Sequence, residues 1–259
     1  GYGAYHQSII AGVYDELGKC DANLLVIAAG MVKPSDFPGL VRRAKTDAMI
    51  YLGPFDEDIL AQMVRNGPPA VVVDHRVRGL RCDSICVDNT AGAADAVRHL
   101  ISRGYGESIG LISGMPGDVS TEERLAGVRL AFQEAGLCFD QVRVVPGNYF
   151  REGGEAAMIA FLQGGKPPRA LFCLNDEMAV GAMKVLRSSG FSIPDDVALM
   201  GFDDTIWAES TNPQLSTVHI DTRQMGQMAM RLLLNRMNDP ATSPMVTVIQ
   251  PHVVVRGTT

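Results

Sequence analysis

The chain has 259 residues, of which 46% are hydrophobic and 20% charged, and its formal net charge is −6 at pH 7. Its 27 glycines and 14 prolines stay below the roughly 25–30% that marks a low-complexity chain, so the composition excludes a disordered protein. No stretch approaches the roughly 18 uninterrupted apolar residues of a membrane span, so we expect no membrane partner. The negative net charge argues against binding of nucleic acid by this polypeptide alone, because phosphate binding needs an electropositive surface.

Short apolar runs alternate with amphipathic segments of helix length, starting with a predicted helix at residues 6–19. The runs are nearly all apolar and do not alternate with polar residues, which is typical of parallel strands covered on both faces. Alternating units of this length predict an α/β fold with a doubly wound parallel arrangement, as one wide sheet or as two sheets. The predicted strands are residues 24–28, 48–52, 70–73, 85–87, 109–113, 142–145, 170–174 and 197–201. The helices between them are residues 36–45, 56–65, 90–103, 121–135, 152–163 and 176–189.

The last third of the chain departs from this rhythm. Residues 215–220 are predicted to be extended, residues 222–238 helical, and residues 246–255 extended again. Because a strand–helix unit normally begins with its strand, the opening helix predicts a further strand upstream of Gly1. Ser120 and Glu123 read as a capping box, which predicts a helix start there. Glycines are expected just past the ends of three helices, at Gly104, Gly136 and Gly190.

The cysteines are five in number and scattered, with no Cys-x-x-Cys pair. We therefore expect reduced thiols in a cytoplasmic protein. Cys82 and Cys86 are close in sequence, but no second cysteine or histidine pair accompanies them, so no metal site is predicted.

Polar side chains gather where the predicted strands end. In open α/β sheets, ligands bind beyond the carboxyl ends of the strands. Carboxylate, amide, hydroxyl and guanidinium groups with aromatic faces suit a polyhydroxylated or heterocyclic small molecule. The residues at these positions are Asp74, Ser113, Gly114, Ser120, Arg124, Tyr149, Phe150, Asn175, Asp176, Asp203 and Asp204. Tyr5 and His6 hold an equivalent position at the start of the first helix.

Each of these residues has a structural alternative. We expect Asp176 to cap its helix, which leaves Asn175 as the better ligand candidate. Ser120 alternatively serves only in the capping box, and Arg124 as a solvated charge on its helix. Turn formation is the alternative for Asp203 and Asp204, and packing is the alternative for Tyr149 and Phe150.

Catalytic signatures are missing from the sequence. It has no Gly-x-Ser-x-Gly elbow, no His-Glu-x-x-His and no phosphate loop ending in Gly-Lys-Ser/Thr. The histidines are widely spread and show no pairing of a nucleophile with a base. We therefore expect a protein that is not an enzyme, with no catalytic residue, cofactor or metal.

A series of longer motifs runs through the chain. The earlier ones are Val87-Asp-Asn-x-x-Gly, His99-Leu-Ile-x-x-Gly and Arg124-Leu-Ala-Gly. The later ones are Asn175-Asp-Glu-Met-Ala-Val-Gly, Gly190-x-x-x-Pro-Asp-Asp-Val, Gly201-Phe-Asp-Asp and Asn212-Pro-Gln-Leu-Ser-Thr-Val. In this order, and over nearly the whole chain, the sequence resembles the lactose-repressor (LacI/GalR) family of transcriptional regulators.

The resemblance implies a core like the type I periplasmic binding proteins, with two doubly wound parallel-sheet lobes joined by a three-crossover hinge. The lobes would comprise residues 1–104 plus 220–251 and residues 105–219 plus 252–259. A small effector, either a sugar or a nucleobase-like metabolite, would bind in the cleft between the lobes and control operator binding allosterically. The family also implies a homodimer, which would reach operator DNA only through a helix-turn-helix headpiece absent from this chain.

The pocket positions of the family fall on seven residues: Tyr5, His6, Ser120, Arg124, Tyr149, Asn175 and Asp203. Arg124, Tyr149, Asn175 and Asp203 are also reached independently from the strand ends. His6 departs from the phenylalanine that is commoner at its position, which leaves the effector open. An exported, monomeric solute-binding protein that serves a transporter would share the fold and the cleft and is the main alternative, and an enzyme that acts on a sugar is the third.

Overall fold

A computed structural model describes residues 3–27, 33–53, 55–76 and 79–259. These residues form an α/β fold built on parallel sheets, as the apolar runs predict. The chain divides into two compact units, Gly1–Val87 with Asp221–Ile249 and Asp88–Ile220 with Gln250–Thr259. It therefore passes between the units three times, after Val87, after Ile220 and after Ile249.

The first passage follows Val87, whereas the family resemblance implied a boundary at residue 104. Helix α4 (Asn89–Ser102) belongs to the second unit because it packs along α5 (Val119–Glu134). A Cβ added at Gly127 of α5 would lie 2.2 Å from the Thr90 carbonyl oxygen, so the glycine lets the two backbones meet. Arg98 of α4 also forms a forked ion pair with Glu134 of α5, with N–O distances of 2.8 and 2.9 Å.

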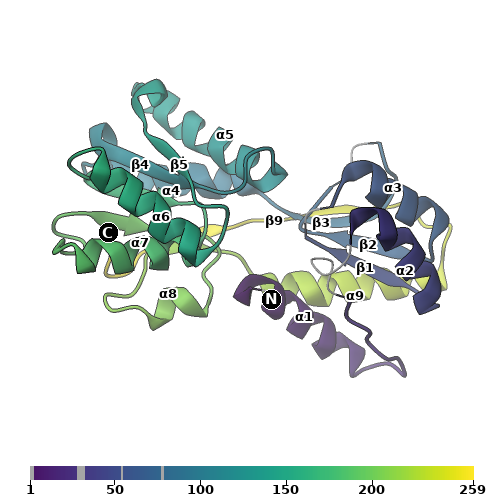
Figure 1. Ribbon diagram of the computed structural model, residues 1–259. Helices are drawn as coiled ribbons and strands as arrows, with labels where there is room; N and C mark the ends of the chain where they lie inside the picture. The colour runs from purple at the N-terminus through teal and green to yellow at the C-terminus, as the bar shows by residue number, and fades with distance from the viewer. Residues whose placement is uncertain (1–2, 28–32, 54, 77–78) are drawn as a thin grey trace. The chain divides into compact units, whose positions relative to one another are not determined.

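The first unit holds a four-stranded parallel sheet with the order β1-β2-β3-β9. Its strands are β1 (Met49–Leu52), β2 (Ala70–Val73), β3 (Asp83–Val87) and β9 (Val246–Ile249). Helices α1 (Ala4–Leu17) and α9 (Thr222–Asn238) lie side by side on one face. The other face carries α2 (Phe37–Ala44), preceded by a 3₁₀ turn at Pro34–Asp36, and α3 (Glu57–Asn66) (Figure 1).

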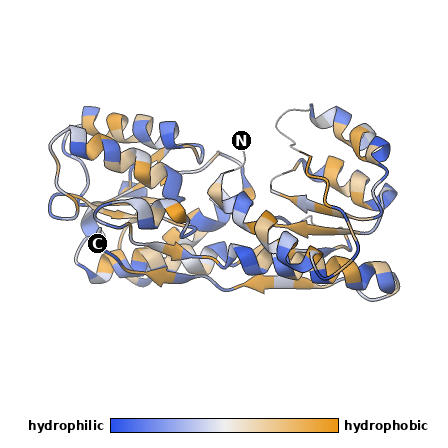
Figure 2. Ribbon diagram, turned by 90° about the horizontal axis from the view of Figure 1, so that it is seen from below, coloured by the Kyte–Doolittle hydropathy of each residue, from blue (hydrophilic) through white to orange (hydrophobic). Residues whose placement is uncertain are grey.

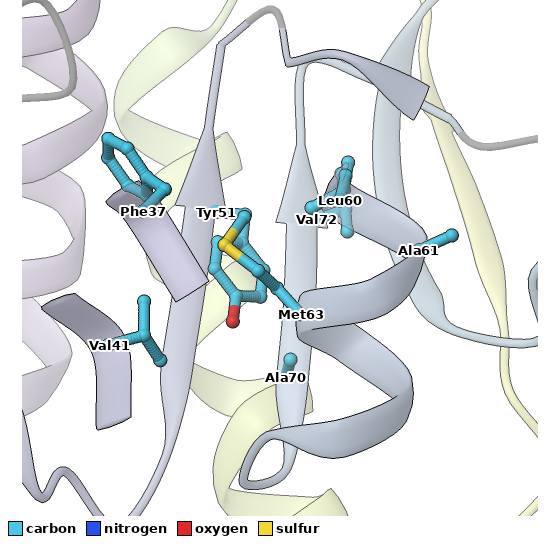
Figure 3. Packing of buried hydrophobic residues seen from close by; sticks show 8 residues of the cluster. All are labelled: Phe37, Val41, Tyr51, Leu60, Ala61, Met63, Ala70 and Val72. Carbon is cyan, nitrogen blue, oxygen red and sulfur yellow. The ribbon is translucent and has the colours of Figure 1, made fainter. Parts of the chain in front are cut away.

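The core of this unit forms where α2 and α3 cover the sheet. Figure 3 shows Tyr51 of β1 among side chains of both helices, including Phe37 and Met63. Tyr51 is 2% exposed and Leu60 is fully buried. Burying side chains of this size stabilises the fold by roughly 1.5–3 kcal/mol each. Figure 2 shows the strands of both units as largely apolar, as expected for sheets covered on both faces.

The strand predicted at residues 24–28 is wrong over its described part, Leu24 to Ile27, and residue 28 lies outside the described residues. Leu24 packs against the apolar cluster that α1 and α9 form with Val13, Leu17 and Met230. Leu25 and Val26, however, are 60% and 47% exposed. A strand requires a neighbour for its backbone hydrogen bonds, and among the described residues β1 pairs only with β2. Apolar composition alone therefore does not make this segment a strand. The strand expected upstream of Gly1 stays a prediction.

The second unit holds a four-stranded parallel sheet with the order β5-β4-β6-β7 and a two-stranded antiparallel sheet of β8 and β10. Helices α4 and α5 lie on one face of the larger sheet, and α6 and α7 on the other (Figure 1). The strands are β4 (Ile109–Ser113), β5 (Val144–Pro146), β6 (Ala170–Cys173), β7 (Ala198–Met200), β8 (Thr217–His219) and β10 (His252–Val254). The remaining helices are α6 (Arg151–Gln163), α7 (Asp176–Ser188) and α8 (Ile206–Ser210), with 3₁₀ turns at Gly106–Ser108 and Phe139–Gln141. The short helix α8 was not predicted.

The structure confirms the predicted glycines at three helix ends and corrects two predicted N-caps. Gly104, Gly136 and Gly190 all have a positive φ, which confirms them as helix-ending residues. Helix α5 is capped by Asp118, whose carboxylate accepts from the Thr121 backbone N–H at 3.0 Å, and not by Ser120. Helix α7 is capped by Asn175 and not by Asp176, which is the first helical residue. In both cases the residue just before the helix has the extended backbone that a cap requires.

The cysteines and the lengths of the helices bear on two further predictions. Cys20, Cys82, Cys138 and Cys173 are free thiols, and the Cys86 thiol donates to the His75 carbonyl oxygen at 3.7 Å. Within the described residues, none of the helices combines the length and the apolar character required to cross a bilayer.

Candidate functional site

Arg124 lies at the centre of a polar cluster in the second unit. Its side chain is buried, with only 4% of the residue exposed. Nε donates to Asn89 Oδ1 at 2.9 Å, Nη2 donates to Asp203 Oδ1 at 3.2 Å, and Nη1 donates to the Leu174 carbonyl oxygen. The guanidinium carbon lies 3.8 Å from the centre of the Phe202 ring. A buried cation is tolerated only when paired in this way, so Arg124 is a constrained group and not a solvated charge.

Asp203 follows β7 in a backbone conformation that L-residues seldom adopt. Its φ is +107°, and the next residue, Asp204, has a φ of +52°. The Asp203 N–H donates to the Val218 carbonyl oxygen at 2.8 Å, which fixes the segment to β8. Such strained positions cost about 1–3 kcal/mol each and cluster at functional sites. This geometry turns a buried carboxylate toward Arg124.

Tyr149 is held rigidly beside this pair. Its hydroxyl forms hydrogen bonds with Thr121 Oγ1 at 2.8 Å and with Asp118 Oδ2 at 3.3 Å. The ring rests on the backbone of Gly114, where an added Cβ would lie 2.2 Å from Tyr149 Cζ. Burial raises the pKa of Tyr149, so the phenol stays protonated at neutral pH and can donate. The Arg124 guanidinium lies 6.0 Å from the ring centre.

Asn175 links the tyrosine to α7. Its Nδ2 donates to the Tyr149 carbonyl oxygen at 3.0 Å, while its Oδ1 accepts from the Met178 backbone N–H at 2.9 Å. The side chain is therefore both a helix cap and a member of the cluster. The sequence predicts the cap at Asp176 and does not predict this second role of Asn175.

Ser120 lies apart from these four residues. It occupies the first turn of α5 and is partly exposed, and its side chain makes no hydrogen bond with the described residues. Its neighbours Asp118 and Thr121 make the contacts with Tyr149 instead.

Tyr5 and His6 belong to a second cluster, in the first unit. The Tyr5 hydroxyl donates to Asp74 Oδ1 at 2.9 Å, and its ring meets that of His6 edge-on at 5.4 Å. His6 packs near Gly53, where an added Cβ would lie 3.3 Å from His6 Nε2. Burial lowers the pKa of His6, so its imidazole is neutral at pH 7. Asp74 follows β2 with a φ of +61°, and its N–H donates to the Ile85 carbonyl oxygen at 2.8 Å.

The strand-end rule thus places Arg124, Tyr149, Asn175 and Asp203 in one cluster, and the structure assembles them there. The strand-end rule did not identify four residues that complete the contacts of that cluster: Asn89, Asp118, Thr121 and Phe202. Asn89 lies at a strand end and could have been found by the same rule, since it follows β3 by two residues. Nothing in the sequence singles out Phe202 as the ring on which the guanidinium rests.

Both clusters are equipped for hydrogen bonding to a small polar molecule. They offer carboxylates, amides, hydroxyls and aromatic faces on rigid supports. Among the described residues, no group of three or more His, Cys, Asp or Glu side chains is arranged to hold a metal ion.

Comparison with known sequences gives a consistent assignment. Residues 97–259 match the family described as a periplasmic binding protein-like domain. The HTH-type transcriptional regulator CelR of Thermobifida fusca is 32% identical over 257 residues, which are 97% of this chain and 75% of that protein. The HTH-type transcriptional repressor PurR of Vibrio campbellii is 29% identical over 258 residues, covering 98% of this chain and 77% of the repressor.

Solved structures of similar proteins agree. A complex of the transcriptional regulator CelR with cellobiose has a TM-score of 0.88 and 29% identity, covering 99% of this chain and 79% of that one. The transcription regulator CcpA of Lactococcus lactis has a TM-score of 0.90 and 25% identity, covering 99% and 95% of the two chains. Both the sequences and the folds point to regulators of transcription.

Proposed function

This chain belongs to the LacI family of transcriptional regulators as its periplasmic-binding-protein-like effector core, and we propose that its effector is a small neutral metabolite. A sugar is our first candidate, and a nucleobase-like compound is the second. The buried, fully paired Arg124 cluster is the observation that carries this choice, because it presents hydrogen-bonding groups without an uncommitted cation for an anionic ligand. The cellobiose complex of CelR supports the sugar.

The residues of the second unit take separate roles in this proposal. Asp203 accepts hydrogen bonds from ligand hydroxyls while Arg124 holds it in place and donates. Asn175 both donates and accepts, and the Tyr149 ring supplies an apolar face for a sugar ring. Ser120 stays a candidate contact at the edge of this set.

We further propose that one effector molecule contacts this cluster and the Tyr5–His6–Asp74 cluster of the first unit. The Tyr5–Asp74 hydrogen bond then orients an acceptor carboxylate, and neutral His6 supplies an uncharged polar group. An effector that touches both units favours the arrangement in which both contacts form. It can shift the regulator between operator-competent and incompetent forms only by its differential affinity for them. Operator DNA would be read by a helix-turn-helix headpiece, and the assembly would be a homodimer.

A thermal-shift screen tests the effector class. The panel comprises neutral monosaccharides and disaccharides including cellobiose, nucleobases and nucleosides, and the phosphate esters of the same sugars. We expect a neutral compound to raise Tm by mass action, and its phosphate ester to do so less. A phosphate ester that binds more tightly than its parent sugar would contradict the neutral effector. A panel without any stabilising compound would contradict the proposed classes.

Substitution of Asp203 tests the site itself. Asp203→Ala should weaken the binding of the compound identified by about 2 kcal/mol or more, which is a loss of affinity of roughly 30-fold, because desolvated hydrogen bonds are lost. Asp140→Ala, which removes an exposed carboxylate from the same unit, is the matched control and should leave affinity unchanged. Calorimetric titration measures both. Equal affinities for the Asp203 variant and the wild type would remove this residue from the site.

A further inference from the structure

Asp176 is a fully buried carboxylate that the proposed contacts with the effector do not use. It is 0% exposed and accepts three hydrogen bonds. The donors are the Thr205 N–H at 2.6 Å, Thr205 Oγ1 at 3.0 Å and Thr217 Oγ1 at 2.6 Å. The Asp176 N–H itself donates to the Phe202 carbonyl oxygen at 2.9 Å. One residue thus joins the start of α7, the segment 202–205 and strand β8.

The segment that Asp176 holds is the one that carries Asp203. Its ends are fixed at Phe202 and Thr205 by the hydrogen bonds just described, and between them lie the two consecutive left-handed residues. The Asp204 N–H donates to Thr217 Oγ1 at 3.4 Å, the same hydroxyl that donates to Asp176. A backbone of this kind persists only where its surroundings enforce it. The direction of the Asp203 carboxylate therefore depends on the contacts of Asp176.

We propose that Asp176 is a positioning residue of the effector site, whose carboxylate fixes the 202–205 turn so that Asp203 faces Arg124. The turn is independent of any ligand, while its consequence for the effector rests on the proposed function. The ionised carboxylate accepts from all three donors, whereas the protonated form must present a proton to one of them. The conformation of the turn consequently depends on the charge of Asp176.

The charge of Asp176 changes near neutral pH. Burial is the dominant cause and raises its pKa to about 7, against the lowering effect of the three hydrogen bonds. Two further titratable groups act on the same region: Cys173, whose pKa burial also raises, and Asp204. Asp204 is paired with His219 at 2.9 Å and with Arg256 at 2.7 Å, and the His219 ring lies 4.9 Å from that of His252. Any test must separate Asp176 from these histidines.

The turn has a reporter of its own. Trp207, the one tryptophan of the chain, lies two residues beyond Thr205, and its ring is 4.3 Å from the Arg151 guanidinium. Tryptophan fluorescence and the hydrogen-exchange protection factors of residues 202–205 can be followed from pH 5.5 to 8.5 in the ligand-free protein. We expect both to change together with a midpoint near pH 7, and protection to be greater at the alkaline end.

Three variants make the test specific. Asp176→Asn should abolish the transition, whereas His219→Gln, which removes the imidazole paired with Asp204, should retain it. Thr205→Val removes one hydrogen bond to the ionised carboxylate and should move the midpoint to higher pH, because such bonds favour the charged form. A structural role alone would not move the midpoint, so this variant also decides the matter if Asp176→Asn fails to fold. A wild-type protein without a transition, or a midpoint unchanged in Thr205→Val, would overturn the proposal.

The consequence for the effector is measured separately. Cellobiose is the first probe, followed by any compound that the thermal-shift panel identifies. The affinity of the protein for the probe should fall as pH falls through 7, in the wild type and in His219→Gln alike. An affinity that stays level with pH in His219→Gln would show that His219 drives the change and would count against Asp176. A panel without hits refutes the proposed effector but leaves the ligand-free transition as the measure of the turn, so the two failures are distinguishable.

Discussion

Arg124 shows how a single residue gains its meaning from burial. From its position on α5, Arg124 would be taken for a surface charge. In the structure it donates hydrogen bonds to Asn89, Leu174 and Asp203, which lie on three other segments of the unit. Its sequence neighbourhood cannot reveal this, because the partners lie at least 35 residues away along the chain. The strand-end rule nevertheless selected Arg124, since parallel strands deliver their following loops to a common edge.

Removal of Arg124 should be strongly destabilising. Arg124→Ala removes the cation that pairs with the buried Asp203 carboxylate and the donor to the Leu174 carbonyl oxygen, and breaking a buried pair in this way costs about 3–5 kcal/mol. Arg187→Ala, which removes an exposed arginine from α7, should change the free energy of unfolding by less than about 0.5 kcal/mol. Urea unfolding measures both. A loss of unfolding free energy below about 1 kcal/mol for Arg124→Ala would contradict the role of the Arg124–Asp203 pair in stabilising the fold.

At the scale of elements, the packing of α1 against α9 depends on a glycine and on ion pairs. A Cβ at Gly226 would lie 1.9 Å from the Ile9 carbonyl oxygen, so the helix backbones meet there. Glu16 of α1 binds Arg231 of α9 and Lys19, and the hydrogen bonds with these two cations lower its pKa to about 2. The contact between Glu16 and Arg231 joins segments more than 200 residues apart in the sequence.

The Glu16 contact predicts a specific pH dependence. A lowered pKa in the folded state stabilises the protein above the unfolded value of about 4.5, and this contribution disappears as pH falls toward 2. Glu16→Gln should therefore be less stable than the wild type at pH 7, and the two should converge in acid. Asp21→Asn, at an exposed site of the same unit, is the control and should track the wild type throughout. Thermal melting between pH 7 and pH 3 measures the gap, and a gap that widens in acid would contradict this assignment.

The elements also show where sequence reasoning succeeds and where it stops. Continuous apolar runs such as β2 and β6 were placed correctly because burial on both faces of a sheet favours apolar residues at every position. Residues 24–27 are also apolar but are not a strand in the structure, so an apolar run by itself does not distinguish a strand from other structure. The caps of α5 and α7 were misplaced by one or two residues for a related reason: several capping residue types occur in succession, and only the backbone conformation decides among them.

At the scale of the whole molecule, each unit is assembled from two stretches of sequence. The boundary after Val87, and not at residue 104, follows from the packing of α4 on α5. Periodicity identifies both helices but not their partnership, which depends on Gly127 and on the ion pair of Arg98. The residue pattern thus predicts most of the strands and helices and leaves open one sheet or two, whereas the allocation of the elements to units requires the tertiary contacts.

The proposed regulator makes a prediction at this scale. Light scattering after gel filtration should give the mass of two chains, because the regulator is proposed to act as a homodimer. The competing function, a solute-binding protein that serves a transporter, predicts one chain. A monomer at concentrations well above those used in the binding assays would therefore count against the regulator and favour the transporter component.

The interleaved course of the chain also bears on how it is made. Strand β9 completes the first sheet beside β3, and β10 pairs with β8, so both units await residues from 246 onward. During synthesis, neither sheet can reach its final set of strands until the ribosome has translated this late stretch. Until then β3 lacks its neighbour β9 and β8 lacks its neighbour β10, so the earlier elements form a partly assembled intermediate with unpaired strand edges. We therefore expect folding during translation to depend on chaperones, because both units are completed only by strands near the end of the chain.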